Sequence, residues 1–281
     1  MSVHMRLPAL LRRTLSSGGP LSLPERYRWL RTFHAWKKTA FTEVLPSSEK
    51  PDTVAILLSY NRPQNIDVIV RLLLRTPSIA KVIVSNNNPR YRMSDWLSVR
   101  DTRLTVIEQC TRQPCHLRYG IAAREKEFHQ FLAVDDDLFL RPSQMEQLCS
   151  ALRSDPARPH GITGMVYDSW RGMMYHNMNK QTQAVDVLNR VYAFTSAHIE
   201  GYRQLLREAG VNPTHTAWKY SYWDDLFLSF SGEKPQVCFV GSYLDCPTQG
   251  KQGIGVWMEP SFFRYRIPIL LMLRRLRPNQ A

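Results

Sequence analysis

The sequence predicts an α/β protein with a mixed, mostly parallel central sheet that is flanked by helices. Largely apolar runs of strand length occur at residues 54–58, 81–84 and 131–134, of which the second begins with Lys81. Such runs are typical of strands that are buried on both faces of a parallel sheet. Residues 66–74 lie between the first two runs and carry apolar side chains at helical spacing. A strand, a helix and a second strand in this order form a right-handed crossover unit by default.

The other elements follow from the same two periodicities, taken along the chain. Further strands are predicted at residues 104–108, 161–167, 185–196 and 237–240. Further helices are predicted at residues 117–128, 142–152 and 198–209, the last one ended by Gly210. No segment repeats along the chain, so a repeat architecture is not expected.

Chain length and charge distribution predict one domain with two basic helical extensions. With 281 residues and 43% hydrophobic composition, the chain can bury a full core. The net charge of +13 is uneven, because residues 1–41 carry +7 and residues 260–281 carry +5. We therefore predict a basic N-terminal extension at residues 1–45, an α/β domain at residues 46–259 and a basic amphipathic tail at residues 260–281.

The two basic ends carry apolar side chains at spacings that suit an amphipathic helix. Trp29, Phe33 and Trp36 recur at helical intervals, and residues 267–273 form an apolar run between arginines. This run is too short to span a bilayer, which takes about 20 residues. A basic amphipathic segment can lie on an anionic membrane surface. The segments can equally pack on the domain or mediate self-association, so the sequence leaves these interpretations and the oligomeric state open.

Two features predict a cytoplasmic protein, with peripheral attachment to a membrane as an open alternative. The apolar residues 7–11 are interrupted by Pro8 and followed by Arg12, so they do not form a convincing secretory signal. The five cysteines are an odd number without metal-type spacing, which is typical of reduced thiols. A disulfide between Cys238 and Cys246 is the alternative that the sequence leaves open.

Three consecutive aspartates, Asp135, Asp136 and Asp137, directly follow the apolar run at residues 131–134. Carboxylates at the end of a buried strand present hard oxygen ligands, where Mg²⁺ or Mn²⁺ can bridge protein and substrate phosphate. The alternative interpretation is a solvated acidic loop. The triplet therefore predicts a metal site for a phosphorylated substrate, provided that other polar residues gather at the same edge of the sheet.

Polar residues do follow the two neighbouring predicted strands. Tyr60, Asn61 and Arg62 come after the first strand, and Asn86 and Asn87 come after the second. The carboxyl ends of parallel strands meet at one edge of the sheet, where open α/β sheets bind their ligands. Asparagine and proline clusters are also ordinary turn residues, so a purely structural role is the alternative for each of these positions.

The order of these pieces resembles the nucleotide-sugar-dependent glycosyltransferases of the GT-A fold over residues 52–245. The resemblance rests on the Tyr-Asn-Arg-Pro turn at residues 60–63, the helix start Arg118-Tyr119-Gly120 and the aspartate triplet. The triplet after Leu-Ala-Val, with the later pair Asp224-Asp225, looks most like the exostosin-like family. The pair here stands in Trp-Asp-Asp-Leu, whereas that family typically has Cys-Glu-Asp-Ile.

The resemblance implies an enzyme that transfers a sugar, N-acetylhexosamine in the exostosin-like family, from a UDP-sugar with retention of configuration. The acceptor would be a glycan or a lipid-linked glycan, and the cofactor Mn²⁺ or Mg²⁺. The leaving diphosphate gains negative charge during transfer, and a divalent cation stabilises it as a Lewis acid. Donor-binding roles are implied for Tyr60, Asn61, Arg62, Asn86, Asn87, Arg118, Asp135 and Asp136.

Metal binding and catalysis are assigned to carboxylates. Asp137 is the expected direct metal ligand, together with Asp135. Asp225, with Asp224, is expected near the anomeric carbon, where a carboxylate can act as a base or support a sugar cation. Arg118 suits the diphosphate because a guanidinium makes bidentate contacts with phosphate oxygens. The alternatives are that Arg118 caps its own helix and that the aspartate pair caps a helix starting at Leu226.

Two other function classes were weighed against this one. Metal-dependent phosphatases of the haloacid dehalogenase type also place Asp-x-Asp after a strand, but on their first strand and with Thr or Val next, whereas Leu138 follows here. A nucleic-acid-binding protein is suggested by the basic ends. Residues 42–259 are nearly neutral, however, with a net charge of +1, and show no nucleic-acid motif.

Overall fold

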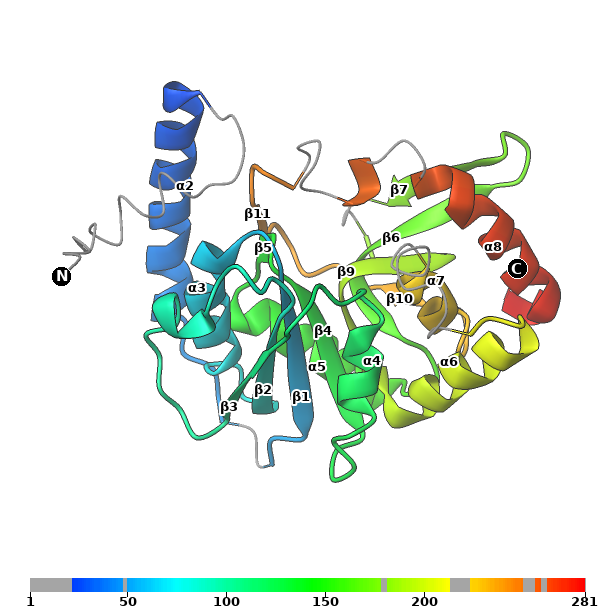
Figure 1. The fold of residues 1–281 in the computed structure, drawn as a ribbon, viewed down its shortest axis with the longest axis horizontal. Helices are drawn as coiled ribbons and strands as arrows, with labels where there is room; N and C mark the ends of the chain where they lie inside the picture. Colours follow the sequence, from blue (N-terminus) through cyan, green and yellow to red (C-terminus); the bar gives the residue numbers. More distant parts are fainter. Residues whose placement is uncertain are drawn as a thin grey trace.

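A nine-stranded sheet forms the centre of the molecule (Figure 1). The structure is a computed structural model that describes residues 22–47, 50–177, 181–212, 223–249, 256–258 and 262–280. The sheet strands are β1 (Thr53–Ser59), β2 (Ile79–Asn86), β3 (Leu104–Glu108), β4 (Gln130–Asp135), β6 (His160–Asp168), β7 (Met173–Asn177), β8 (Gln183–Ala184), β9 (Val187–Thr195) and β10 (Gln236–Val237). Their order is β3-β2-β1-β4-β9-β6-β10-β8, with β7 paired to β6 beside this path. Two short strands, β5 (Leu138–Phe139) and β11 (Leu244–Asp245), form a separate antiparallel pair.

The helices cover both faces of this sheet (Figure 1). They are α2 (Leu23–Thr42), α3 (Pro63–Leu73), α4 (Leu117–Ala122), α5 (Pro142–Ser154), α6 (Ser196–Glu208), α7 (Asp224–Ser229) and α8 (Phe262–Leu276). Short 3₁₀ turns are η1 (Met93–Asp95), η3 (Val256–Met258) and η4 (Pro278–Gln280). Local sequence explains several ends: α3 and α5 each begin on a proline, which suits the first helical position. Gly210 follows α6 with φ +65°, the left-handed conformation that ends helices.

The sheet is parallel in the half that carries the acidic triplet. Strands β3, β2, β1 and β4 are all parallel, and α3 makes the predicted crossover between β1 and β2. Strand β9 runs antiparallel to both of its neighbours, β4 and β6. The predicted fold class is therefore confirmed: a mixed, mostly parallel sheet flanked by helices, consistent with a GT-A fold.

The core has one layer on each face of the sheet, which explains the continuous apolar runs. In β1, Ala55 and Leu57 face the helices α2, α3 and α5, whereas Val54 and Ile56 face α4, α6, α7 and α8. All four side chains are fully buried. Burying one such side chain is worth about 1.5–3 kcal/mol, so a polar substitution at either face of β1 would lose a large part of the net stability.

The basic ends pack on the domain, which was one of the interpretations that the sequence left open. In α2, Trp29, Phe33 and Trp36 surround Phe139, and the Phe33 and Phe139 ring centroids are 4.9 Å apart. At the other end, α8 buries Leu270 and Leu273 in the second core layer. The predicted boundary at residues 259 and 260 therefore separates residues that share one core. Residues 1–21 of the predicted N-terminal extension lie outside the described residues.

Membrane contact by these ends stays a prediction. No helix in the described part of the chain is long and apolar enough to cross a bilayer. The five cysteines are free thiols, so the alternative bridge between Cys238 and Cys246 is absent from this structure.

Two predicted elements are shorter in the structure than in the sequence pattern, and four short strands were not predicted. The helix predicted at residues 117–128 ends at Ala122, because the carbonyls of Ile121 and Ala122 accept i to i+3 bonds that tighten the last turn. The late strand at residues 237–240 contributes only Gln236–Val237 to the sheet. Strands β5, β8 and β11 were not predicted, because two-residue strands are set by distant pairing partners. Strand β7 was also missed, although it pairs with the preceding strand β6 as a hairpin.

Candidate active site

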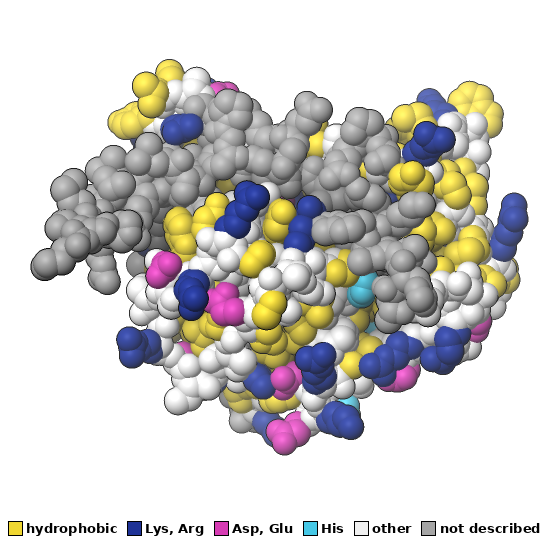
Figure 2. Space-filling model, in the orientation of Figure 1, with side chains coloured by type: hydrophobic (Ala, Val, Ile, Leu, Met, Phe, Trp, Pro, Cys, Tyr) yellow, Lys and Arg dark blue, Asp and Glu magenta, His cyan; other side chains and the backbone are white. Residues whose placement is uncertain are grey.

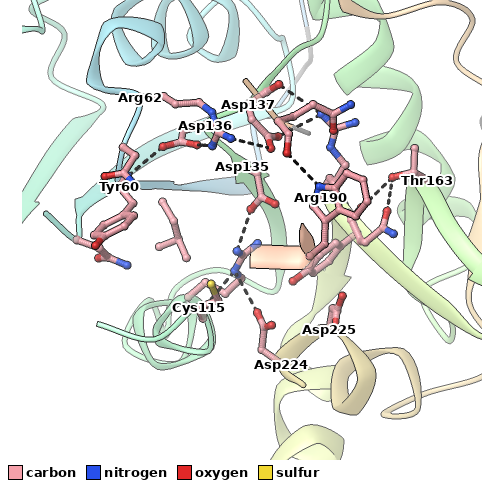
Figure 3. A pocket seen from close by; sticks show the side chains of 18 of the residues that line it. Tyr60, Arg62, Cys115, Asp135, Asp136, Asp137, Thr163, Arg190, Asp224 and Asp225 are labelled. Atoms are coloured by element: carbon pink, nitrogen blue, oxygen red, sulfur yellow. Dashed lines mark hydrogen bonds and ion pairs between the residues drawn. The ribbon is translucent and has the colours of Figure 1, made fainter. Parts of the chain in front are cut away.

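A cavity of about 400 Å³ opens at the carboxyl ends of β1 and β4 (Figure 3). The parallel register brings these ends together, because Leu58 pairs with Asp135 and Ser59 pairs with Asn86. The volume is in the range of ordinary ligand sites. Ten of the eleven residues predicted from the sequence line the cavity: Tyr60, Asn61, Arg62, Asn87, Arg118, Asp135, Asp136, Asp137, Asp224 and Asp225.

Asp136, the middle residue of the triplet, holds the loop after β1. Its Oδ1 accepts a hydrogen bond from Arg62 Nη1 at 2.7 Å, and its Oδ2 accepts one from the Tyr60 backbone N–H at 3.0 Å. Burial would lower the pKa of Arg62, but the carboxylates of Asp136 and Asp137 raise it above its usual range. Both oxygens of Asp136 thus accept hydrogen bonds from the protein, which makes this carboxylate a support for the loop after β1.

Asp135 and Asp224 share one buried guanidinium. Arg118 Nη2 donates to Asp135 Oδ1 at 2.9 Å, and Arg118 Nε lies 3.7 Å from Asp224 Oδ2. Figure 3 shows the carboxylates of Asp135 and Asp224 on opposite sides of the guanidinium that they share. Burial lowers the pKa of Arg118, but the surrounding Tyr192, Asp135 and Asp224 raise it. The pKa of Arg118 therefore lies well above its usual range. Arg118 therefore stays charged inside the cavity wall and does more than cap its helix.

Asp224 is the carboxylate with the most perturbed titration in the cavity. Burial raises the pKa of Asp224 to about 7, Arg118 opposes this, and the nearby charges of Asp225 and Asp135 add to it. Burial also raises the pKa of Asp135, against the effect of Arg118. A carboxyl group with a pKa near neutrality can exchange a proton at physiological pH. Asp224 is therefore suited to proton transfer.

Asp225 is held by an arginine that the sequence reasoning missed. Arg266 on α8 donates from Nη1 to Asp225 Oδ1 at 2.7 Å and from Nη2 to Oδ2 at 3.1 Å. Arg266 is 1% exposed, and such a two-point contact fixes the carboxylate in one orientation. Asp224 and Asp225 also form the first turn of α7, which begins at Asp224 after the N-cap Trp223, so they do not cap a helix that starts at Leu226. Arg266 lies in the predicted basic tail, and its charge was the only sequence signal.

Asp137 is held by a second missed arginine, Arg190 on β9. Arg190 Nη2 donates to Asp137 Oδ1 at 3.1 Å and to the Asp137 carbonyl at 3.3 Å. The same nitrogen lies 2.6 Å from Asp245 Oδ1. Burial lowers the pKa of Arg190, but Asp137 and Asp245 raise it above its usual range, so the guanidinium stays charged. The sequence signal was weak: the polar pair Asn189-Arg190 interrupts an apolar strand.

Tyr60 and two of the three predicted asparagines line the cavity, whereas the third asparagine has a structural role. Asn61 and Asn87 line the cavity, and the Tyr60 ring lies 4.4 Å from the Arg112 guanidinium. Asn86 was predicted to face the same site but is fully buried outside the cavity wall. Its Nδ2 donates to Glu108 Oε2 and to a backbone carbonyl instead. Its side chain is the last one of β2, and it joins the end of this strand to β3.

The carboxylates of Asp135 and Asp137 fit a divalent cation that takes its remaining ligands from a bound substrate. Carboxylate oxygens are the donors that Mg²⁺ and Mn²⁺ prefer. Asp135 Oδ2 and Asp137 Oδ2 accept no hydrogen bond from the residues that the structure describes, and the nearest recorded charge to the latter is Arg62 Nη2 at 3.8 Å. Within those residues, no group of three or more His, Cys, Asp or Glu side chains is arranged to hold a metal. Phosphates and water usually complete such sites.

Comparisons with known proteins give remote structural matches and no match of sequence families. No protein-family model matches the chain, and no curated protein matches it. Among solved structures, the chain is similar to the crystal structure of GalNAc-T7 with UDP, GalNAc and Mn²⁺, with 9% identity and a TM-score of 0.47. The match covers 78% of this chain and 53% of that one, so the chain spans about half the length of that protein. The residues of the cavity therefore carry the functional argument.

Proposed function

We propose that this protein is a metal-dependent glycosyltransferase of the GT-A type, which moves a sugar from a UDP-sugar to a glycan or lipid-linked acceptor. The observation that carries the proposal is the cavity wall at the carboxyl ends of the parallel strands. There, three buried or half-buried arginines, Arg62, Arg118 and Arg190, each pair with one aspartate of the triplet. Guanidinium groups suit a diphosphate, and carboxylates suit the divalent cation that accompanies it.

The diphosphate end of the donor would lie against the triplet. Asp137 and Asp135 would hold Mn²⁺ or Mg²⁺, which as a Lewis acid stabilises the negative charge of the leaving diphosphate. Arg118 is fixed by Asp135, so its charge is already in place when a phosphate arrives. Tyr60, Asn61 and Asn87 line the same wall and would contact the nucleoside.

The sugar end would lie against Asp224 and Asp225. Asp225 was the first choice for catalysis from the sequence, and its rigid contact with Arg266 suits a carboxylate facing a positively charged, oxocarbenium-like sugar. Asp224 is better suited to proton transfer, since burial raises its pKa to about 7. The N-acetylhexosamine donor and retention of configuration, which the resemblance implies, belong to the proposal. An inverted product would remove retention and make Asp224 the general base for the acceptor hydroxyl.

A panel of UDP-sugars with Mn²⁺ tests this proposal. We expect Mn²⁺-dependent hydrolysis of one donor in the absence of acceptor, and NMR of the product gives its anomeric configuration. The Asp137→Ala variant should lose Mn²⁺-dependent UDP binding in calorimetry, whereas Asp225→Asn should bind UDP normally and lose turnover. Full turnover by Asp225→Asn would refute its catalytic role. Salt-sensitive binding of random RNA without any UDP binding would instead favour the nucleic-acid alternative.

A cytoplasmic location with contact to an anionic membrane is the proposed setting, because the acceptor would be membrane-proximal. Exposed hydrophobic side chains gather with basic ones over β7 and α8 (Figure 2). Trp170 is 87% exposed, and Met173, Phe263 and Leu271 are also exposed. Flotation with anionic vesicles tests the setting, and a Trp170→Ser variant should float less. Equal flotation on neutral and anionic vesicles would count against an electrostatic contact.

A further inference from the structure

Arg190 has a backbone conformation that a bulky side chain rarely adopts. It is the one non-glycine residue with positive φ in the described part of the chain, at φ +65°. The register of β9 against β6 shifts between Gly161 and Thr163, so a bulge accommodates the extra residue on β9. Glycine or asparagine would take this conformation with less strain. An arginine kept at such a position indicates that its side chain has a function there.

The Arg190 side chain lies between two carboxylates at the edge of the cavity. Its Nη2 atom contacts Asp137 Oδ1 at 3.1 Å and Asp245 Oδ1 at 2.6 Å, and its guanidinium lies 6.0 Å from the Tyr243 ring centroid. Its Nε atom is buried without a hydrogen-bond partner among the described residues. All of these contacts come from Nη2, so Nε and Nη1 donate no hydrogen bond to the described residues, on a side chain that lines the cavity.

We propose that Arg190 is a positioning residue that occupies the cation position at Asp137, so that a divalent cation binds well only together with a diphosphate. This inference rests on the proposed function. The guanidinium uses Asp137 Oδ1 and places a permanent positive charge beside it, which opposes a divalent cation at the same carboxylate. A diphosphate offers the guanidinium a further anionic partner through bidentate contacts. Arg190 would then move from Asp137 to the phosphate, and Asp137 would become available to the cation.

Titration of Mn²⁺ into the full-length protein without nucleotide tests the proposal, with calorimetry or the electron paramagnetic resonance signal of free Mn²⁺ as the readout. We expect Arg190→Gly and Arg190→Asn to bind Mn²⁺ about tenfold or more tightly than the natural protein, a difference of about 1.4 kcal/mol. Both replacements suit the left-handed conformation, so the variants should fold. Arg190→Lys keeps the charge and should stay weak. Arg171→Ala removes an exposed arginine that pairs only at the surface with Asp168, and should change nothing.

UDP provides the second half of the test. The natural protein should bind Mn²⁺ more tightly with UDP than without it, whereas the Gly and Asn variants should gain much less. Unchanged Mn²⁺ affinity in both variants without UDP would overturn the role of Arg190 while leaving the proposed function standing. No Mn²⁺ binding by any protein, with or without UDP, would overturn both.

Discussion

Replacing Asp224 by asparagine should stabilise the protein at neutral and alkaline pH. The pKa of Asp224 is raised from 3.8 to about 7, chiefly by burial. The folded state therefore binds more protons than the unfolded state between these two pH values, and the free energy of unfolding falls as pH rises through this window. One pKa unit of difference corresponds to about 1.4 kcal/mol, so the ionised carboxylate costs the fold at most about 4 kcal/mol above neutral pH. Arg118 offsets part of this cost, and the titration of Asp224 is coupled to that of Asp225. We therefore expect Asp224→Asn to raise the free energy of unfolding by about 2–4 kcal/mol.

Urea unfolding followed by tryptophan fluorescence measures this gain. The Asp224→Asn variant should match the natural protein at about pH 3, below both pKa values, where the carboxyl is mostly neutral in both states, and exceed it increasingly toward about pH 8. Asp67→Asn is the matched control with the opposite sign. Burial would raise the pKa of Asp67, but hydrogen bonds from Arg71 and Ser98 lower it. That variant should therefore lose stability at about pH 8 and lose less of it in acid. If the stability difference between Asp224→Asn and the natural protein is absent at about pH 8, or does not change with pH, burial does not raise the pKa of Asp224.

Three further changes test the packing around the site by thermal or urea unfolding. Arg190→Gly should be about 1 kcal/mol more stable than Arg190→Ala, because φ is +65° at this position. If the alanine variant is the more stable one, the backbone at this position is not strained. Arg266→Met should cost about 3–5 kcal/mol by leaving Asp225 without its partner, and adding Asp225→Asn should recover part of that loss; no recovery would show that the loss comes from packing alone. Gly201→Ala should destabilise by about 1–3 kcal/mol, since its Cβ would meet a backbone oxygen at 2.2 Å. Its control, Gly120→Ala in α4, has nothing within 4 Å and should be neutral or stabilising.

The parallel half of the sheet was predictable because its information is local. The apolar runs at residues 54–58, 81–84 and 131–134 became β1, β2 and β4, each with small changes at the ends. Strand ends follow from these runs, and polar residues at strand ends identify the edge at which ligands bind. Seven of the ten predicted residues that line the cavity follow the ends of these strands, whereas Arg118, Asp224 and Asp225 were assigned from the family resemblance.

The charge partners of these residues could not be predicted from the sequence. Arg190 contacts a carboxylate 53 positions away, and Arg266 contacts one 41 positions away. No local periodicity carries such pairings, because they depend on a bulge in β9 and on where α8 docks. The prediction for Asn86 missed a similar distant contact. Asn86 lies at a strand end as predicted, but its side chain donates a hydrogen bond to Glu108 on the neighbouring strand and does not line the cavity.

The contact between Arg266 and Asp225 links the completion of the cavity to the synthesis of α8. Strands β1 to β4 are encoded before residue 136, whereas Arg266 is made near the end of the described chain. Domains generally fold as units, so Asp225 gains its arginine only when α8 has been made. A nascent chain that ends before α8 would therefore lack both the partner of Asp225 and the core residues Leu270 and Leu273. Proteolytic removal of α8 would return the folded protein to that same unfinished state.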